Sequence, residues 1–166
     1  MIVNTAAYLF VPLDDAEALA GSLFERAKAQ ALRGTLLVAG RDASQAKALA
    51  ATLGHGAQGV ALDHQAPGLA ATLREWGVGL VIHTAGPFQA QAYNVAQAAA
   101  EAGAHYIDLA DGRRFVCDFP AAMQAAFAAA GRTAVAGASK VPALSSAVID
   151  HLCAGWQRID SIDICI

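Results

Sequence analysis

Short apolar runs alternate along the chain with longer stretches of helical periodicity. Val78–His83 is a run of strand length, and Gln89–Ala102 then carries apolar or small residues at helical spacing. Gly103 follows, where a C-cap glycine is expected, and His105–Leu109 is a second strand-like run. A strand, a helix and a strand within about 30 residues indicate a βαβ unit. We expect its strands to be parallel and its connection right-handed.

The same alternation extends over the rest of the chain. The other expected strands are Met1–Val11, Thr35–Ala39, Val60–Leu62, Thr133–Ala136 and Arg158–Ile166, and the other expected helices are Ala16–Leu32, Ser44–Leu53 and Ala121–Ala130. This order favours the α/β class, with a three-layer, Rossmann-like, mostly parallel sheet. We expect a single domain over residues 1–157 and an extra C-terminal strand over 158–166. In that strand, Ile162, Ile164 and Ile166 alternate with more polar residues.

Composition and charge exclude several classes of function. The chain has 166 residues, of which 56% are hydrophobic and 15% charged, so it suits one globular domain. A net charge of −3 without a basic cluster argues against nucleic-acid or membrane partners. No apolar run approaches the roughly 20 residues of a membrane span, and the N-terminus lacks signal-peptide features. Three widely spaced cysteines, Cys117, Cys153 and Cys165, predict reduced thiols in a cytoplasmic protein, and no residue pattern indicates a metal site.

The turn after the first expected strand has the wrong chemistry for a dinucleotide. In such folds this turn supplies glycines, so that backbone N–H groups approach a pyrophosphate at a helix N-terminus. Here the turn is Val11–Asp15, which has no glycine. Pro12 has no N–H to donate, and the carboxylates of Asp14 and Asp15 would repel a phosphate. The turn predicts that binding of a dinucleotide is weak or lost.

A glycine pattern of the dinucleotide type does occur, at Gly54–Gly59. The functional motif must follow a strand and open a helix. This one follows the expected helix Ser44–Leu53 and precedes the expected strand Val60–Leu62. We interpret it as a helix-to-strand loop.

Two groups of residues follow expected strands and are candidates for a site. Gly86 and Pro87 lie beyond the strand Val78–His83, where open α/β sheets bind ligands, although Gly-Pro also suits an ordinary turn. A polar cluster after the next strand could hold a polar substrate, with surface ion pairing as the commoner alternative. It consists of Asp108, Asp111, Arg113 and Arg114. His83 is interpreted as a packed histidine at a strand end.

Four ordered motifs resemble the nucleotide-binding half of saccharopine dehydrogenase-type oxidoreductases. They are AGRD at 39–42, HTAGPF at 83–88, AGAHYIDL at 102–109 and GASKVPALSS at 137–146. The resemblance covers residues from Leu37 to about Ile166. It implies NADP as the cofactor and, beyond Arg158, the first strand of a substrate-bearing domain that the chain does not continue.

The resemblance also implies which residues bind the cofactor. They are Gly40, Arg41, Asp63, Ala85, Gly86, Pro87 and Ser139. Arg41 would meet the 2′-phosphate of NADP, which suits a guanidinium, or it is an exposed charge at the start of a helix. Asp63 would lie near the adenine, or it is a solvated loop carboxylate. Ser139 would belong to a loop near the nicotinamide, or to a plain turn.

The first 40 residues or so resemble a different family, the rhodanese-like tRNA uridine hydroxylation proteins. The motifs are MIVNTAAY at 1–8, FVPLDD at 10–15 and LRGTLL at 32–37. The catalytic cysteine of that family belongs to a later rhodanese domain, of which this sequence has no part. Residues 1–37 thus look like a foreign first βα unit, joined near Thr35–Gly40. Ordinary divergence of that unit is the alternative.

Together these features predict a truncated or chimeric NADP-binding-type domain without catalytic activity of its own, and no catalytic residue is assigned. The alternatives are an engineered or recombinant folded protein that binds no cofactor and, less favoured, a fragment of a tRNA-modifying enzyme. The apolar edge of the expected strand Arg158–Ile166 further predicts a homodimer, in which two copies of this strand pair.

Overall fold

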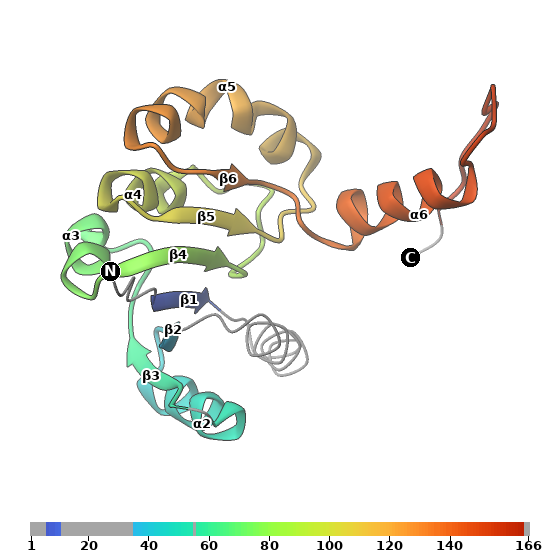
Figure 1. The fold of residues 1–166 in the computed structure, drawn as a ribbon. Helices are drawn as coiled ribbons and strands as arrows, with labels where there is room; N and C mark the ends of the chain where they lie inside the picture. Colours follow the sequence, from blue (N-terminus) through green and yellow to red (C-terminus); the bar gives the residue numbers. More distant parts are fainter. Residues whose placement is uncertain (1–5, 11–34, 55, 165–166) are drawn as a thin grey trace, which may run out of the picture.

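Six strands form one parallel sheet in the order β3-β2-β1-β4-β5-β6 (Figure 1). This computed structural model describes residues 6–10, 35–54 and 56–164. The strands are β1 Ala6–Phe10, β2 Leu36–Gly40, β3 Gln58–Ala61, β4 Val78–His83, β5 His105–Asp108 and β6 Ala134–Val135. The expected turn Val11–Asp15 and helix Ala16–Leu32 lie outside the described residues. The strand order reverses between β1 and β4, which is the topological switch of the Rossmann fold.

Helices cover both faces of this sheet. The helices are α2 Ala43–Leu53, α3 Leu69–Glu75, α4 Asn94–Ala102, α5 Arg113–Ala130, η1 Lys140–Leu144 and α6 Ser145–Leu152. On β2, Val38 packs with α2, whereas its neighbours Leu37 and Ala39 belong to the core formed with α3, α4 and α5. Successive side chains of a strand point to opposite faces, so these contacts place α2 and α3–α5 on opposite sides. The predicted three-layer α/β architecture is confirmed.

Helix α4 is shorter than predicted at its beginning. It starts at Asn94 rather than Gln89, because the preceding residues form the loop after β4. In that loop, Gln91 Nε2 donates to the backbone oxygens of Ala85 and Pro87. The end of α4 is as predicted, since Gly103 follows it with φ 73°, a left-handed conformation that favours glycine.

Helix α5 begins eight residues before the predicted Ala121, at Arg113, and contains Pro120. A proline usually marks the first turn of a helix, because it lacks the N–H of an internal hydrogen bond. Here the helix continues through it because one face buries Phe115, Phe119, Met123 and Phe127, spaced four residues apart. Burial of these side chains offsets the lost hydrogen bond.

The glycine pattern at 54–59 is a helix-to-strand connection, as predicted. It runs from the end of α2 into β3. Gly59 lies within β3, where a side chain would overlap the backbone of Ala46 and Lys47 in α2. This glycine therefore permits close packing of a helix on a strand.

The C-terminal part of the chain extends away from the sheet as an arm formed by α6 and residues 153–164 (Figure 1). None of the residues of α6 is buried. The extra strand predicted over Arg158–Ile166 is not formed in the described residues 158–164, which have no regular secondary structure. A strand needs a neighbour to pair with, and the sheet ends at β6. Among the described helices, none is long and apolar enough to cross a membrane.

Candidate functional site

The carboxyl edge of the sheet collects the residues that were predicted to bind a cofactor. Because the strands are parallel, their carboxyl ends lie at one edge. Gly40 ends β2 and Arg41 follows it, Asp63 comes just after β3, and the loop Ala85–Pro87 comes just after β4. Ser139 lies beyond β6. The topology therefore brings all seven predicted residues to the same edge.

Arg41 is the cation best placed to meet an anion at this edge. It is exposed, and no hydrogen bond or salt bridge joins its guanidinium to another described residue. The next residue, Asp42, caps α2, since its carboxylate accepts from the backbone N–H of Ser44 at 2.8 Å and of Gln45 at 3.2 Å. Asp42 is thus occupied by the helix. A Cβ on Gly40 would meet no atom within 4 Å, so there is open space beside Gly40, the residue before Arg41.

Asp63 shapes the loop after β3. Its Oδ1 accepts from the backbone N–H of Gln65 at 2.9 Å, and its carbonyl oxygen accepts from that of Ala66 at 3.0 Å. These bonds form a local turn of the kind that aspartate favours. The side chain is exposed. The exposure of Asp63 and its bonds within the loop agree with a solvated loop carboxylate, which was one of the two predicted alternatives. A contact with adenine stays a prediction.

His64 also lies at the carboxyl edge, although no role was expected for it from the sequence. Its ring is 5.6 Å, between centroids, from that of His83 at the end of β4. Burial is the main cause that lowers the pKa of His64, and the charge of Arg41 adds to it, whereas Asp63 acts to raise it. No spacing pattern in the sequence could reveal this position. It depends on the path of the loop across the sheet.

The loop after β4 is held by the side chain of Gln91, which follows it in the chain. Gln91 Nε2 lies 2.6 Å from the carbonyl oxygen of Ala85 and 2.9 Å from that of Pro87. Gly86 and Pro87 are exposed and joined by a cis peptide bond. A Cβ on Gly86 would only make ordinary contacts with Phe88. Packing against the described residues therefore does not explain why this position is glycine. Close approach of a ligand is one explanation that remains.

Beneath this loop lies a buried polar group formed by His83, Tyr106 and Asp108. Their side chains are at most 2% exposed. His83 Nδ1 lies 3.1 Å from the hydroxyl of Tyr106. Burial lowers the pKa of His83 to about 3, and burial together with the Asp108 carboxylate raises the pKa of Tyr106. The prediction that His83 is a packed strand-end histidine is confirmed.

Asp108 anchors the chain that follows β6. Its Oδ1 accepts from the backbone N–H of Ala110 at 3.0 Å and of Gly137 at 2.7 Å, and its carbonyl oxygen accepts from that of Ala138 at 2.9 Å. Burial raises the pKa of the Asp108 carboxyl despite these bonds. Ser139 is fixed nearby, because its Oγ lies 2.6 Å from the carbonyl oxygen of Val141 and 3.3 Å from that of Ala110.

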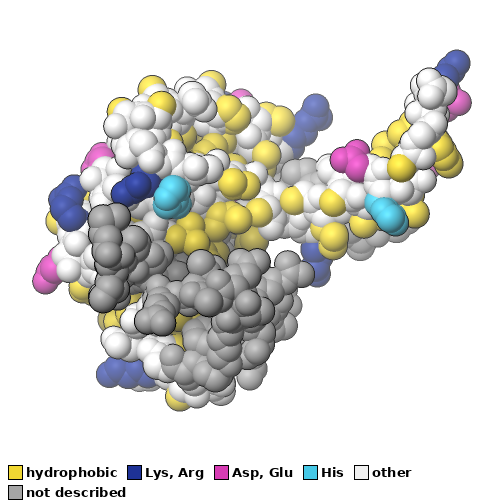
Figure 2. Space-filling model, in the orientation of Figure 1, with side chains coloured by type: hydrophobic (Ala, Val, Ile, Leu, Met, Phe, Trp, Pro, Cys, Tyr) yellow, Lys and Arg dark blue, Asp and Glu magenta, His cyan; other side chains and the backbone are white. Residues whose placement is uncertain are grey.

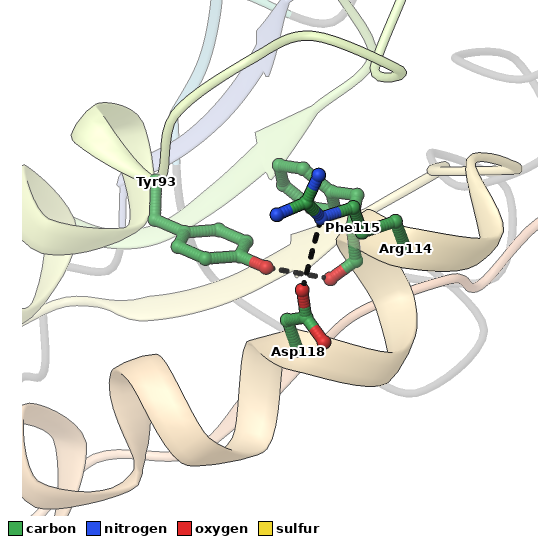
Figure 3. A network of polar contacts seen from close by, with 4 residues as sticks. All are labelled: Tyr93, Arg114, Phe115 and Asp118. Carbon is green, nitrogen blue, oxygen red and sulfur yellow. Dashed lines mark hydrogen bonds and ion pairs between the residues drawn. The ribbon is translucent and has the colours of Figure 1, made fainter.

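The predicted polar cluster after β5 does not form one site. Asp108 is buried, whereas the exposed Asp111 accepts from Gln89 Nε2 at 3.2 Å. Arg114 pairs with Asp118, one turn further along α5, at 3.5 Å (Figure 3). In the same view, the hydroxyl of Tyr93 donates to the carbonyl oxygen of Phe115 at 2.9 Å. For Arg114, the alternative of surface ion pairing is therefore correct.

Solved structures with a similar fold are oxidoreductases. An NAD binding oxidoreductase from Klebsiella pneumoniae matches with a TM-score of 0.58 and 21% identity, over 90% of this chain and 39% of its own. A shikimate 5-dehydrogenase from Mycobacterium fortuitum matches with a TM-score of 0.53 and 22% identity, over 81% of this chain and 44% of its own. At this level of identity the likeness establishes the Rossmann-like fold. The chain spans less than half the length of either protein.

Curated relatives match a short part of the chain. The tRNA uridine(34) hydroxylases of three strains of Xanthomonas campestris pv. campestris are 56% identical to it over 39 residues. That segment makes up 24% of this chain and 15% of the hydroxylases. It is consistent with the second predicted resemblance, but a match of this length does not carry the activity of those enzymes to this chain.

The model of the family described as "Saccharopine dehydrogenase NADP binding domain" matches residues 17–135. The match starts upstream of the expected boundary at Leu37, includes the ends of β2, β3 and β4 described above, and covers well over half of the chain. The chain therefore belongs to the saccharopine dehydrogenase NADP binding domain family.

Proposed function

We propose that this chain is the NADP-binding part of an oxidoreductase and holds the dinucleotide along the carboxyl edge of its sheet. The observation that carries the proposal is the exposed Arg41, which has no partner among the described residues and lies beside open space at Gly40. A guanidinium suits a phosphate monoester, which NADP carries and NAD lacks. One carboxylate oxygen of Asp42, Oδ1, is engaged by the N-terminus of α2, which directs this side chain toward the helix.

The other predicted residues have proposed roles along the same edge. Ala85, Gly86 and Pro87 would line the middle of the cofactor through their backbone, because their side chains are small and Gly86 and Pro87 are exposed. Ser139, held against Ala110, would border the nicotinamide end. Asp63 would lie at the adenine end. When bound, NADP would supply the hydride chemistry, and the described residues would bind and orient it.

We further propose that affinity is low and that the domain alone has no catalytic activity. The first βα turn, Pro12–Asp15, offers two carboxylates and no glycine where a pyrophosphate needs backbone donors. At the other end, His83 and Asp108 are fully buried beneath the β4 loop and cannot reach a substrate. Reactive groups would have to come from outside this domain. A foreign origin of the first βα unit would account for the turn. The shared 39-residue segment supports that origin, whereas the family match, which begins at residue 17 inside this unit, favours ordinary divergence.

Titration with NADPH tests the proposal. The fluorescence of Trp76 and Trp156 should be quenched as energy passes to the nicotinamide, with a dissociation constant weaker than micromolar. Replacing Pro12–Asp15 by a glycine-rich turn should increase the affinity, because backbone N–H groups would replace carboxylates. Micromolar or tighter binding by the unmodified chain would contradict the proposed weakness.

The second candidate function is a folded protein that binds no cofactor. The carboxylates of the Pro12–Asp15 turn favour it. Under this alternative, neither the unmodified chain nor the variant with a glycine-rich turn would bind NADPH. Circular dichroism of both proteins would first show that they are folded.

A further inference from the structure

His64 lies at the carboxyl edge through the path of its loop. Two strands, β2 and β1, separate β3 from β4 in the sheet. His64 nevertheless follows β3 and places its ring 5.6 Å from that of His83, the last residue of β4. The loop between β3 and α3 therefore carries this half-buried imidazole across the topological switch. Dinucleotides bind at that point of such sheets.

Three titratable groups of the described residues lie near enough to His64 to influence its charge. Arg41, after β2, and His83, on β4, come from other elements, and Asp63 precedes His64 in its own loop. His83 is neutral above about pH 3. Burial and Arg41 both disfavour a charge on His64, and Asp63 only partly opposes them, so the pKa of His64 is below its usual 6.5. Without a ligand, this lowered pKa favours the neutral imidazole at pH 7.

An anion between Arg41 and His64 would reverse this balance. A negative charge within a few ångströms favours the charged form of histidine, and a phosphate oxygen accepts a charge-assisted hydrogen bond from an imidazolium. The sequence Pro12–Asp15 contains two carboxylates and no glycine, so we expect few backbone donors from it for such an anion. A cationic pair formed by Arg41 and His64 would take over part of that role.

We propose that His64 is a second ligand, beside Arg41, for a phosphate group of the bound dinucleotide, and that it takes up a proton when the phosphate binds. This inference rests on the proposed function. It adds His64 to the proposed NADP site and makes the affinity for the dinucleotide depend on pH. The phosphate is either the 2′-phosphate or the pyrophosphate. The chemistry of the contact is the same for both.

Because proton uptake and cofactor binding are linked, the affinity for the cofactor should depend on pH. If binding takes up one proton, the affinity falls by up to tenfold for each unit of pH above the pKa of His64 in the ligand-free chain. We would measure the dissociation constants of NADPH and NADH by fluorescence transfer from about pH 6.5 to about pH 8.5, where a phosphate monoester, with a second pKa near 6, is mostly a dianion. The affinity of the unmodified chain should fall across this range. His64→Gln should bind more weakly at pH 6.5 and show a flat profile.

Two control variants separate this role from others. Arg158→Gln removes an exposed charge on the C-terminal arm and should leave the pH profile unchanged. His64→Phe keeps an aromatic ring without a titratable group, so it should lose affinity as His64→Gln does. Full affinity in His64→Phe would show that the ring merely stacks on the ligand, and would overturn the proposal.

Comparison of the two cofactors identifies the phosphate. A pH-dependent affinity for both NADPH and NADH assigns the contact to the pyrophosphate, and one for NADPH alone assigns it to the 2′-phosphate. The NMR titration of the His64 ring protons should show a higher pKa in the presence of saturating cofactor. Binding with the same pH profile in the unmodified chain and in His64→Gln would overturn this inference only. Failure of the unmodified chain to bind either cofactor at any pH would overturn the proposed function as well.

Discussion

The carboxylate of Asp108 accepts a 2.7 Å hydrogen bond from the backbone N–H of Gly137, and so joins the end of β5 to the chain that leaves β6. The same oxygen accepts from Ala110, and the side chain has no exposed surface. A buried donor that loses its acceptor costs about 1–3 kcal/mol. Asp108 is therefore predicted to stabilise the fold, whereas the sequence suggested either a polar substrate site or surface ion pairing for its cluster.

Replacement of Asp108 by alanine should lower the free energy of unfolding by at least about 2 kcal/mol, because two buried N–H groups lose their acceptor. Urea denaturation followed by circular dichroism measures the change. Asp111→Ala is the matched control, since the exposed Asp111 accepts one hydrogen bond from Gln89, and its effect should stay within about 0.5 kcal/mol. Equal losses in the two variants would contradict the anchoring role of Asp108.

The stability of the domain should depend on pH through His83. Burial lowers its pKa to about 3 in the folded chain, against 6.5 when unfolded. The unfolded chain therefore binds more protons between these values, and this contribution to stability is complete above about pH 6.5 and decreases as the pH falls toward 3. The variant His83→Asn should lose less stability than the unmodified chain between pH 7 and pH 5, in urea titrations at both values. His151→Asn, at an exposed position of α6, is the control and should behave like the unmodified chain.

Asp108 should act in the opposite direction in acid. Its raised pKa means that the folded chain binds the proton more tightly than the unfolded chain does. Stability from this group is therefore present below the unfolded pKa of 3.8 and decreases as the pH rises through the folded pKa. Asp108→Asn keeps an acceptor for the two N–H groups but cannot titrate. From pH 4 upward, the unfolding free energy of the unmodified chain should therefore fall relative to that of Asp108→Asn.

Arg41 should set the choice of cofactor. If NADP binds, its 2′-phosphate gains a charge-assisted contact that NAD cannot make. Arg41→Ala should remove a preference of roughly 1.5–3 kcal/mol, which is about 10–150-fold in affinity. Competition between NADPH and NADH in fluorescence titrations measures the ratio, with Arg158→Ala as the control on the distant arm. Equal affinity of the unmodified chain for both cofactors would rule this role out.

Local patterns determined much of the fold in advance. The strands from β2 to β5 and the glycine that ends α4 were predicted from apolar runs and turn residues. The order of elements also predicted that the glycine pattern at 54–59 is a helix-to-strand connection. The beginnings of α4 and α5 were missed because tertiary contacts decide them. Gln91 hydrogen-bonds the β4 loop, so the residues before Asn94 do not form the first turn of a longer helix α4. In α5, burial of the phenylalanines stabilises the helix on both sides of Pro120.

The candidate site was predictable only in part. The resemblance of short motifs identified residues that the topology does bring to one edge. It could not show that Asp42 caps a helix, that Asp108 binds Gly137, or that His64 crosses the sheet to reach His83. Each of these facts depends on the direction of a side chain in space, which spacing along the sequence does not encode.

The C-terminal arm presents an uncovered row of apolar side chains. The row begins at Leu144, which ends η1 just before the arm, and continues at Val148, Leu152 and Trp156, each four residues further on. These side chains are 46–68% exposed, and apolar side chains are visible along the arm in Figure 2. Ile159, Ile162 and Ile164 follow with 43–51% exposure. A helix of eight residues such as α6 is too short to be stable by itself in water, so the arm needs a partner surface.

We predict that this partner is a second copy of the chain. The described residues 158–164 form no strand, so we no longer expect two C-terminal strands to pair. We expect instead that the apolar row of one arm packs on that of another. A two-fold arrangement brings the same row against itself and closes the assembly. Light scattering should give the mass of a dimer for the full chain. Val148→Glu and Leu152→Glu should each shift it toward the monomer, whereas Arg158→Glu, also an exposed charge on the arm, should not. A monomeric full-length chain would contradict the prediction, as would a dimer that persists after deletion of residues 145–166.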